Sequence, residues 1–372
     1  MQAALRSAIQ SSKHYSAVFA RARASRSRVT SAYDISSTCN LFCEGCLFFD
    51  RDGGHAGAAE RADIAHFEDL FAAEKARGVT YPLMAGAEPA LRQDVLRVAA
   101  RHFRGGMVHS NGTVRLDPAL PFRIFISVWG GPALTKQWRG ADCYEKSLRT
   151  AAADPRAIVN YTVNAKNIDD IYRVSEDCDR LGVQITFQAY SPTADYQDYL
   201  SDADGASHTY IQSGSAEDNL VLSADDDARA ADAICTAVDA FPETVAFTKP
   251  LARYAFGRPG PFYDAEFVGA APKHCLPARH PQHRHFQLGG IEETEKTCGH
   301  GNTECRTCRT YTTIYPGFFR EMLNKPMTKD EAIDFLDAHE VFDVLYMGGR
   351  YSGGRLRTSL APSSIEQLSA AE

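Results

Sequence analysis

Strand-like and helix-like segments alternate along this 372-residue chain from about residue 31 to residue 190. Short runs of β-branched and aromatic residues predict strands, and apolar residues three and four positions apart predict helices. This order predicts the α/β class, with a parallel sheet whose strands are joined by helical crossovers, and with six strands in place of the eight of a closed barrel. The expected strands are 32–37, 79–84, 106–109, 122–128, 157–163 and 183–189, and the expected helices are 62–77, 90–103, 143–153 and 167–181.

Three cysteines, Cys39, Cys43 and Cys46, stand directly after the first expected strand. Three thiolates on one tight loop can hold three corners of a cubane iron–sulfur cluster and leave its fourth iron without a protein ligand. A zinc site is the alternative, but structural zinc takes four tetrahedral ligands, and the nearest additional donor is His55. The segments that follow downstream favour a [4Fe–4S] cluster with one open iron over zinc.

Polar residues follow the next three expected strands, at the edge where a parallel barrel gathers its reactive groups. A carboxylate such as Glu88 suits a cationic group, and Asn111 and Ser127 can hydrogen-bond the hydroxyls of a ligand. Taken one at a time, the first segment is also typical of a turn, and the other two of strand-end caps. The segments are Met84-Ala-Gly86-Ala87-Glu88-Pro89, His109-Ser-Asn111-Gly112 and Ile126-Ser127-Val-Trp129-Gly130-Gly131.

Together, these four segments resemble the radical S-adenosylmethionine (SAM) family. The cysteine spacing is similar to the family signature, and the other segments are similar, in the same order, to its Gly-Gly-Glu-Pro, Thr-Asn-Gly and Ser-x-Asp-Gly motifs. The resemblance implies a partial (β/α)6 TIM barrel of the radical SAM type. It also implies an enzyme that cleaves SAM to a 5′-deoxyadenosyl radical and abstracts hydrogen from a small-molecule biosynthetic intermediate, with a flavodoxin or ferredoxin-type protein as reductant.

The same resemblance implies a set of SAM-binding residues. Gly45 stands where the family has an aromatic residue, so Phe42, Leu47 or Phe48 is expected to contact the adenine instead. Arg139, in Gln137-Trp-Arg-Gly140, is expected to meet the SAM carboxylate as a bidentate fork. The full expected set is Phe48, Gly86, Glu88, Asn111, Ser127, Arg139, Asn164 and Gln188.

A second group of four cysteines follows near the carboxyl end: Cys275, Cys298, Cys305 and Cys308. Four thiolates can close an auxiliary [4Fe–4S] cluster or bind a structural zinc ion. The layout resembles the twitch extension, a shorter form of the SPASM domain, found after the barrel in one branch of the family. Cys39-Asn-Leu-x-Cys43-x-Gly45-Cys46, Ser191-Pro-x3-Tyr196 and Gly299-His-Gly301-Asn302-x2-Cys305-x2-Cys308 also resemble the adenosylhopane synthase branch.

Three residues are candidates for returning hydrogen to a substrate radical: Cys143, Cys235 and Tyr190. Cys178 shares an apolar helix face and is expected in the core. Dehydrogenation with electron loss to the auxiliary cluster, epimerisation, and adenosyl transfer to an alkene as in adenosylhopane synthase all remain open. A non-catalytic iron–sulfur or zinc protein is the alternative from a different class.

Composition narrows the setting of this chemistry. The net charge is −7 and the 40 basic residues are dispersed, which argues against nucleic acid as a partner. No run of eighteen apolar residues and no signal peptide is present, and the grouped cysteines favour metal in a reducing compartment, so we expect a cytoplasmic protein. The expected organisation is a basic segment (1–30), the barrel (31–190), a lid or insert (191–270), the auxiliary domain (271–320), and a C-terminal helix with a glycine-rich tail (321–372).

Overall fold

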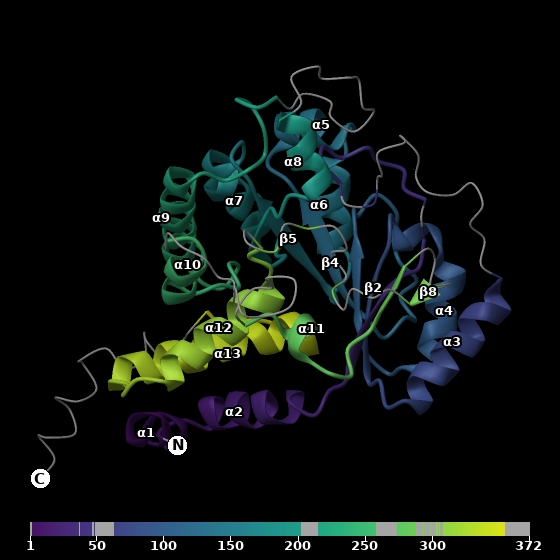
Figure 1. The fold of residues 1–372 in the computed structure, drawn as a ribbon. Helices are drawn as coiled ribbons and strands as arrows, with labels where there is room; N and C mark the ends of the chain where they lie inside the picture. The colour runs from purple at the N-terminus through teal and green to yellow at the C-terminus, as the bar shows by residue number, and fades with distance from the viewer. Residues whose placement is uncertain are drawn as a thin grey trace, which may run out of the picture.

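A parallel sheet forms the centre of the computed structural model (Figure 1). The structure describes residues 2–36, 38–46, 48, 63–201, 215–257, 274–287, 292–293, 298, 303, 305 and 308–353. Within them the strand order is β6-β5-β4-β3-β2-β1-β7-β8, parallel throughout except for the antiparallel pair of β7 and β8. The first six strands lie in sequence order without a switch point, as in a barrel that has not closed, so the expected α/β fold with six crossover-linked strands is confirmed.

The six strands lie close to their expected positions. They are β1 (Thr30–Asp34), β2 (Tyr81–Ala85), β3 (Met107–Ser110), β4 (Arg123–Val128), β5 (Ala157–Val163) and β6 (Ile185–Ala189). All seven residues of β5 are buried, because helices cover one face and the cavity side is enclosed. The crossover helices are α3 (Ile64–Ala76), α4 (Gln93–His102), α6 (Tyr144–Ala152) and α7 (Ile171–Leu181), with 3₁₀ turns at Pro89–Leu91 and Ile168–Asp170.

A strand far along the chain extends this sheet beyond β1. β7 (His285–Gln287) pairs in parallel with β1, placing Ala32 opposite His285 and Tyr33 opposite Phe286, and β8 (Glu292–Glu293) pairs with β7. The rings of Tyr33 and Phe286 stack with centroids 5.4 Å apart. The C-terminal third of the chain therefore completes one edge of the N-terminal sheet.

The described parts of residues 192–256 are largely helical. They include α8 (Ala194–Ser201), which was not among the expected helices, and α5 (Pro132–Arg139), earlier in the chain, was also not expected. α9 (Ala224–Ala240) begins with a capping box between Ser223 and Asp226, and α10 (Lys249–Ala255) packs against it. Apolar side chains of both helices join the main core, so this stretch belongs to the body of the fold.

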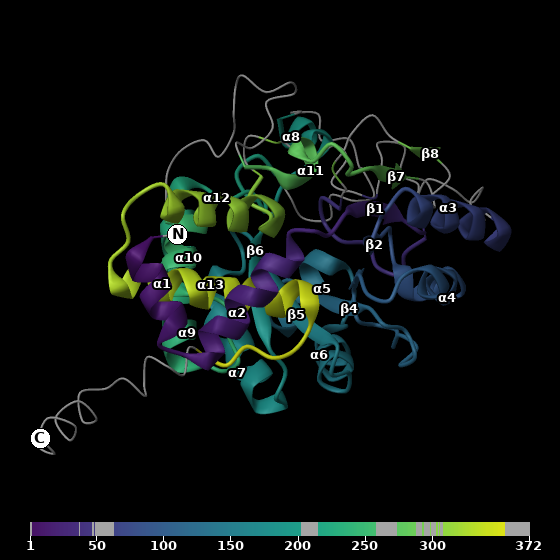
Figure 2. The same ribbon diagram turned by 90° about the horizontal axis from the view of Figure 1, so that it is seen from below.

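The two ends of the described chain pack together. α1 (Ala3–Gln10) and α2 (Lys13–Ser25) lie against α13 (Lys329–Met347), which also contacts α12 (Tyr311–Leu323), and Figure 2 shows α2 crossing α13. The Tyr15 hydroxyl donates to Asp337 Oδ1 at 2.8 Å, inside this contact. The expected basic segment is therefore packed on the fold, because one face of α2 is buried on α13. The short α11 (Leu276–Arg279) lies near α12.

No helix in the described part of the chain combines the length and the apolar character needed to cross a membrane.

Candidate functional site

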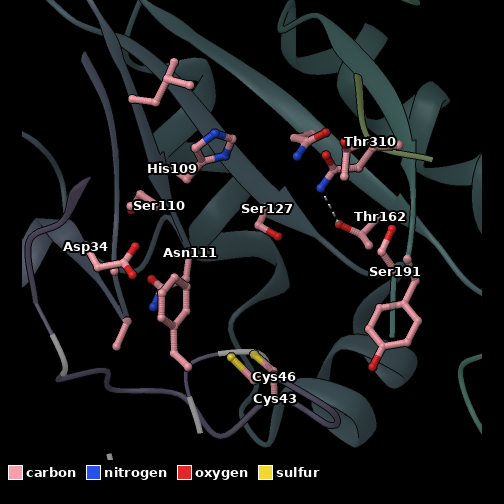
Figure 3. A pocket seen from close by; sticks show the side chains of 18 of the residues that line it. Asp34, Cys43, Cys46, His109, Ser110, Asn111, Ser127, Thr162, Ser191 and Thr310 are labelled. Atoms are coloured by element: carbon pink, nitrogen blue, oxygen red, sulfur yellow. Dashed lines mark hydrogen bonds between the residues drawn. The ribbon is translucent and has the colours of Figure 1, made fainter. Parts of the chain in front are cut away.

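A cavity of about 240 Å³ opens at the carboxyl ends of the strands. Its lining comes from the first cysteine loop, from all six barrel strands or the turns after them, and from Cys298 and Thr310–Thr312 of the C-terminal third. Figure 3 shows this arrangement, with Cys43 and Cys46 at one end, and Asp34 and Ser191 on opposite sides. The sequence motifs and both cysteine groups thus border one space.

The three thiols of the first loop lie together at this cavity. Cys39, Cys43 and Cys46 all line it and none forms a disulfide, and in Figure 3 the sulfur atoms of Cys43 and Cys46 lie side by side. Burial, with smaller contributions from Cys43 and Glu88, raises the pKa of Cys39 to about 11, and burial also raises that of Cys46. Thiolates here need a positive partner, which suits a bound metal cluster.

A network of amides braces the start of the cysteine loop. Asn111 Nδ2 donates to Asn40 Oδ1 at 2.8 Å and contacts Cys39 Sγ at 3.7 Å. Its Oδ1 accepts from the backbone N–H and the hydroxyl of Thr113, and Asn40 Nδ2 donates to the same hydroxyl. The hydrogen-bonding capacity of the Asn111 side chain is therefore taken up inside the protein, although the residue lines the cavity.

Two tyrosines hold the other end of the loop. Tyr190 Oη donates to the Gly45 carbonyl at 3.0 Å, and Tyr196 Oη donates to the buried carboxylate of Glu44 at 3.1 Å. A Cβ atom on Gly45 would lie 2.2 Å from Tyr190 Oη, and Gly45 has a φ of +55°. Glycine is needed here because Tyr190 fills the space beside it.

This packing accounts for the departure at Gly45. Tyr190 and Trp129 both line the cavity, with ring centroids 5.8 Å apart in an edge-to-face arrangement. Phe48 lines the cavity as well, whereas Phe42 is 45% exposed and does not. Leu47 lies outside the described residues. An aromatic surface therefore reaches the cavity from β4 and β6.

Replacing Gly45 by alanine is expected to destabilise the cysteine loop by about 1–3 kcal/mol, through the positive φ and the close approach of Tyr190. Tyr190→Phe alone loses one hydrogen bond, about 1 kcal/mol. In the double variant the hydroxyl is gone, so the cost should be smaller than the sum of the two. Chemical denaturation of the four proteins measures this coupling, and strict additivity would show that the contact is unimportant.

Glu88 is a buried carboxylate at the turn after β2, with 1% exposure. Its Oε1 accepts from Ala90 N–H at 2.9 Å and from the Ser110 hydroxyl at 2.8 Å, and its Oε2 accepts from Asn111 N–H at 2.7 Å. Burial raises the pKa of Glu88, although these hydrogen bonds and Arg139 oppose the shift. A carboxylate has about four acceptor positions, so the three donors orient Glu88 and leave one position for a ligand.

Arg139, at the end of α5, is the positive group at the cysteine end. Its side chain is buried, donates to the Ser127 carbonyl and lies near Cys43, and its Nε has no hydrogen-bond partner within the described residues. Burial is the largest single influence on the pKa of Arg139 and lowers it. The nearby thiols, Cys43 first among them, together outweigh burial, so the pKa lies above its usual value. The unpaired Nε leaves a donor for an anionic group. Ser127 lines the cavity with its side chain (Figure 3).

The remaining expected residues divide between the cavity and its surroundings. Gly86 and Gln188 line the cavity, whereas Asn164 does not: its backbone N–H and its Oδ1 form a turn with Asn167 and Lys166. Cys143 is buried behind the cysteine loop, and Cys235 lies on α9. Neither thiol lines the cavity, so no contact with the cavity supports a role for either one in returning hydrogen. Cys178 is fully buried in the core, as its position on the helix face predicts.

The cysteines of the second group lie near enough to Cys275 to affect its pKa. Burial, and then the neighbouring thiols of Cys298, Cys308 and Cys305, raise the pKa of Cys275 to about 12. Cys298 lines the cavity, so one member of this group faces the same space as the first loop. Among the described residues, no three His, Cys, Asp or Glu side chains converge on a single metal ion. His55 and residues 299–302 lie outside the described part of the chain.

Sequence reasoning missed two pairs that meet across the fold. Asp34 Oδ2 lies 3.0 Å from His285 Nε2, and His109 Nε2 lies 2.7 Å from Tyr311 Oη. Asp34, His109 and Tyr311 line the cavity. The partners are more than 200 residues apart in each pair, and the only local signal was a polar residue at the end of a strand.

Comparisons with known proteins add a limited likeness. No protein-family model matches the chain, and a search of curated proteins finds no match. The crystal structure of Streptococcus suis SuiB is similar at 14% identity and a TM-score of 0.38, over 45% of this chain and 41% of SuiB. The structure of native anSMEcpe with bound AdoMet is similar at 14% identity and a TM-score of 0.46, over 77% of this chain and 80% of that one.

Proposed function

We propose that the protein is a radical SAM enzyme acting on a small molecule. The observation that carries the proposal is that three cysteines outside any disulfide, a carboxylate with one open acceptor position and a buried arginine with an unpaired donor all line one cavity. Cys39, Cys43 and Cys46 would hold a [4Fe–4S] cluster. When bound, such a cluster supplies the electron that cleaves SAM to methionine and a 5′-deoxyadenosyl radical, which abstracts hydrogen from the substrate.

The chain's own residues would bind and orient SAM. Glu88 would accept a hydrogen bond from the methionyl ammonium, and Arg139 Nε would donate to its carboxylate, because both groups lie near Cys39 at the same end of the cavity. Trp129 and Tyr190 would offer the aromatic surface for the adenine. Asn111 would act by bracing the cysteine loop through Asn40, beyond the direct contact expected from the sequence.

The second cysteine group would hold an auxiliary [4Fe–4S] cluster in a twitch-like domain. Since Cys298 borders the cavity, a substrate radical formed there would lie close to this centre, which favours dehydrogenation among the open reactions. The initial electron would come from a flavodoxin or ferredoxin-type protein.

Anaerobic reconstitution followed by incubation with SAM and dithionite tests the proposed function. We expect about eight irons per chain and formation of 5′-deoxyadenosine. A protein that binds iron but forms no 5′-deoxyadenosine would be a scaffold or sensor, and one with a single zinc and four irons would exclude the second cluster.

Replacing Cys305 by alanine tests the role of the auxiliary site. The three remaining thiolates would lose a closed ligand shell whose binding energy is also local folding energy, so proteolysis within residues 271–320 should become faster. Product formation should fall more than SAM cleavage without product, because the first cysteine loop does not include any residue of the second cysteine group. Wild-type turnover in this variant would show that the auxiliary site neither accepts electrons nor braces the domain.

A further inference from the structure

The wall of the cavity formed by β4, β5 and β6 carries polar side chains at neighbouring positions. The sheet register places Ser127 opposite Asn160, and Thr162 opposite Gln188. Residues 160 and 162 are two apart on β5 and therefore face the same side. All four line the cavity, and Ser191 extends the set just beyond β6 (Figure 3). The inside of a closed barrel is usually packed with branched apolar side chains, so this polar wall needs an explanation.

Several of these groups are buried without a partner. Asn160 Oδ1, Gln188 Oε1 and Ser191 Oγ have no hydrogen bond within the described residues, and Asn160 is only 2% exposed. Asp34 Oδ1, on the opposite side of the cavity, is also buried and unpaired. Burying polar atoms without hydrogen bonds is unfavourable, and native proteins retain few such groups without a reason. Because all four oxygens can accept, the missing partner should be rich in hydroxyl donors.

The charged side chains that line the cavity restrict the class of ligand further. Arg139 is the one lysine or arginine among the described residues that line the cavity, and it lies beside Cys43 at the cysteine end. A phosphate or carboxylate placed against Asn160 and Gln188 would have no cationic partner there, and it would lie in the same cavity as the Asp34 carboxylate. A hydrocarbon would leave the amide oxygens unpaired.

We propose that this wall binds an uncharged, polyhydroxylated ring, such as a cyclitol or an unphosphorylated sugar, as the substrate. The inference rests on the proposed function for the position of SAM at the cysteine end, and it names the substrate class of that site. The amide oxygens of Asn160 and Gln188 accept from ring hydroxyls, and the Ser191 hydroxyl completes the contact. A polyprenoid alkene is excluded by the same reasoning.

Equilibrium binding to the reconstituted full-length protein, saturated with SAM and without reductant, tests the proposal. The probes are a panel of myo-inositol and unphosphorylated hexoses, with glucose 6-phosphate and farnesol as the anionic and isoprenoid comparisons, followed by saturation-transfer NMR. We expect at least one neutral polyol to bind, and more tightly than either comparison. Asn160→Leu and Gln188→Leu should each weaken it at least tenfold, whereas Asn324→Leu, outside the cavity lining, should not.

The affinity for SAM in the same variants separates this proposal from the proposed function. We expect it to be unchanged, because the proposal assigns the polar wall to the substrate, including Ser127 and Gln188, which the sequence resemblance had assigned to SAM. A tenfold loss of SAM affinity in Asn160→Leu would show that the wall contacts the cofactor, and would overturn the proposal while supporting SAM binding. Binding of farnesol or glucose 6-phosphate in preference to every neutral polyol, or no polyol binding at all, would also overturn it. If Asn160→Leu unfolds, Gln188→Leu alone decides, because Gln188 lies near the carboxyl end of β6 at a partly exposed position.

Discussion

The variant with Cys39, Cys43 and Cys46 all replaced by alanine is expected to lose about four irons per chain and all formation of 5′-deoxyadenosine. The three thiols are the only cysteines of the first loop, and Asn111, Tyr190 and Tyr196 hold that loop in place from outside. The loop should therefore stay folded after the thiols are removed, and the loss should reflect missing ligands. Iron analysis and chromatography of the nucleoside product measure both effects.

Cys235→Ala is the matched control for this experiment. Cys235 is buried on α9 and does not line the cavity, so its replacement removes a thiol without touching either cysteine group. Iron content and 5′-deoxyadenosine formation should equal those of the unmodified protein. If the triple variant keeps its iron, or still forms 5′-deoxyadenosine, the cluster lies elsewhere and the proposed function is wrong.

Glu88→Gln is expected to weaken SAM binding by about 1.5–3 kcal/mol, which is roughly tenfold to 150-fold. The neutral amide loses the charge-assisted bond to the ammonium. All three groups that bond to Glu88 are donors. The NH₂ group of the glutamine would therefore face the N–H of Asn111, or the Ala90 N–H and the Ser110 hydroxyl, and two donors cannot bond to each other. The iron content should not change, and equilibrium dialysis of SAM measures the loss.

Ser110→Ala distinguishes the charge of Glu88 from its orientation. The variant removes one of three donors to the carboxylate and keeps the charge, so its effect on SAM affinity should be clearly smaller than that of Glu88→Gln. Equal affinities for SAM in the unmodified protein and in Glu88→Gln would show that Gly86-Ala-Glu-Pro is only a turn.

Local periodicity was sufficient to predict the barrel strands. β5 occupies the expected residues 157–163, because a fully buried strand is a continuous apolar-rich run bounded by turns. The same reasoning failed for β7, which has three residues and whose partner β1 lies about 250 positions earlier. α12 carries Pro316 and Gly317 within it, so propensity argues against a helix that tertiary packing stabilises.

Some residues of the candidate site could be predicted from local sequence, and others could not. Cys39, Cys43, Cys46 and Glu88 belong to compact motifs, so sequence placed them at strand ends where the structure also has them. The use of the Asn111 amide by Asn40 and Thr113 was not predictable, because it depends on how two loops meet. Gln188 was expected at the site as a SAM contact, but Asn160 and the polar wall that the two residues share were not predicted, because the wall appears only when the register of β5 and β6 is known.

The pairing of β1 with β7 has a consequence for synthesis of the chain. At about 5–20 residues per second, the ribosome needs roughly 10–50 s to proceed from β1 to β7, and during this time one edge of the nascent sheet has unpaired backbone groups. Exposed edges are templates for aggregation, and contacts between distant residues slow folding. The edge of β1 is therefore exposed to aggregation until residues 285–287 cover it.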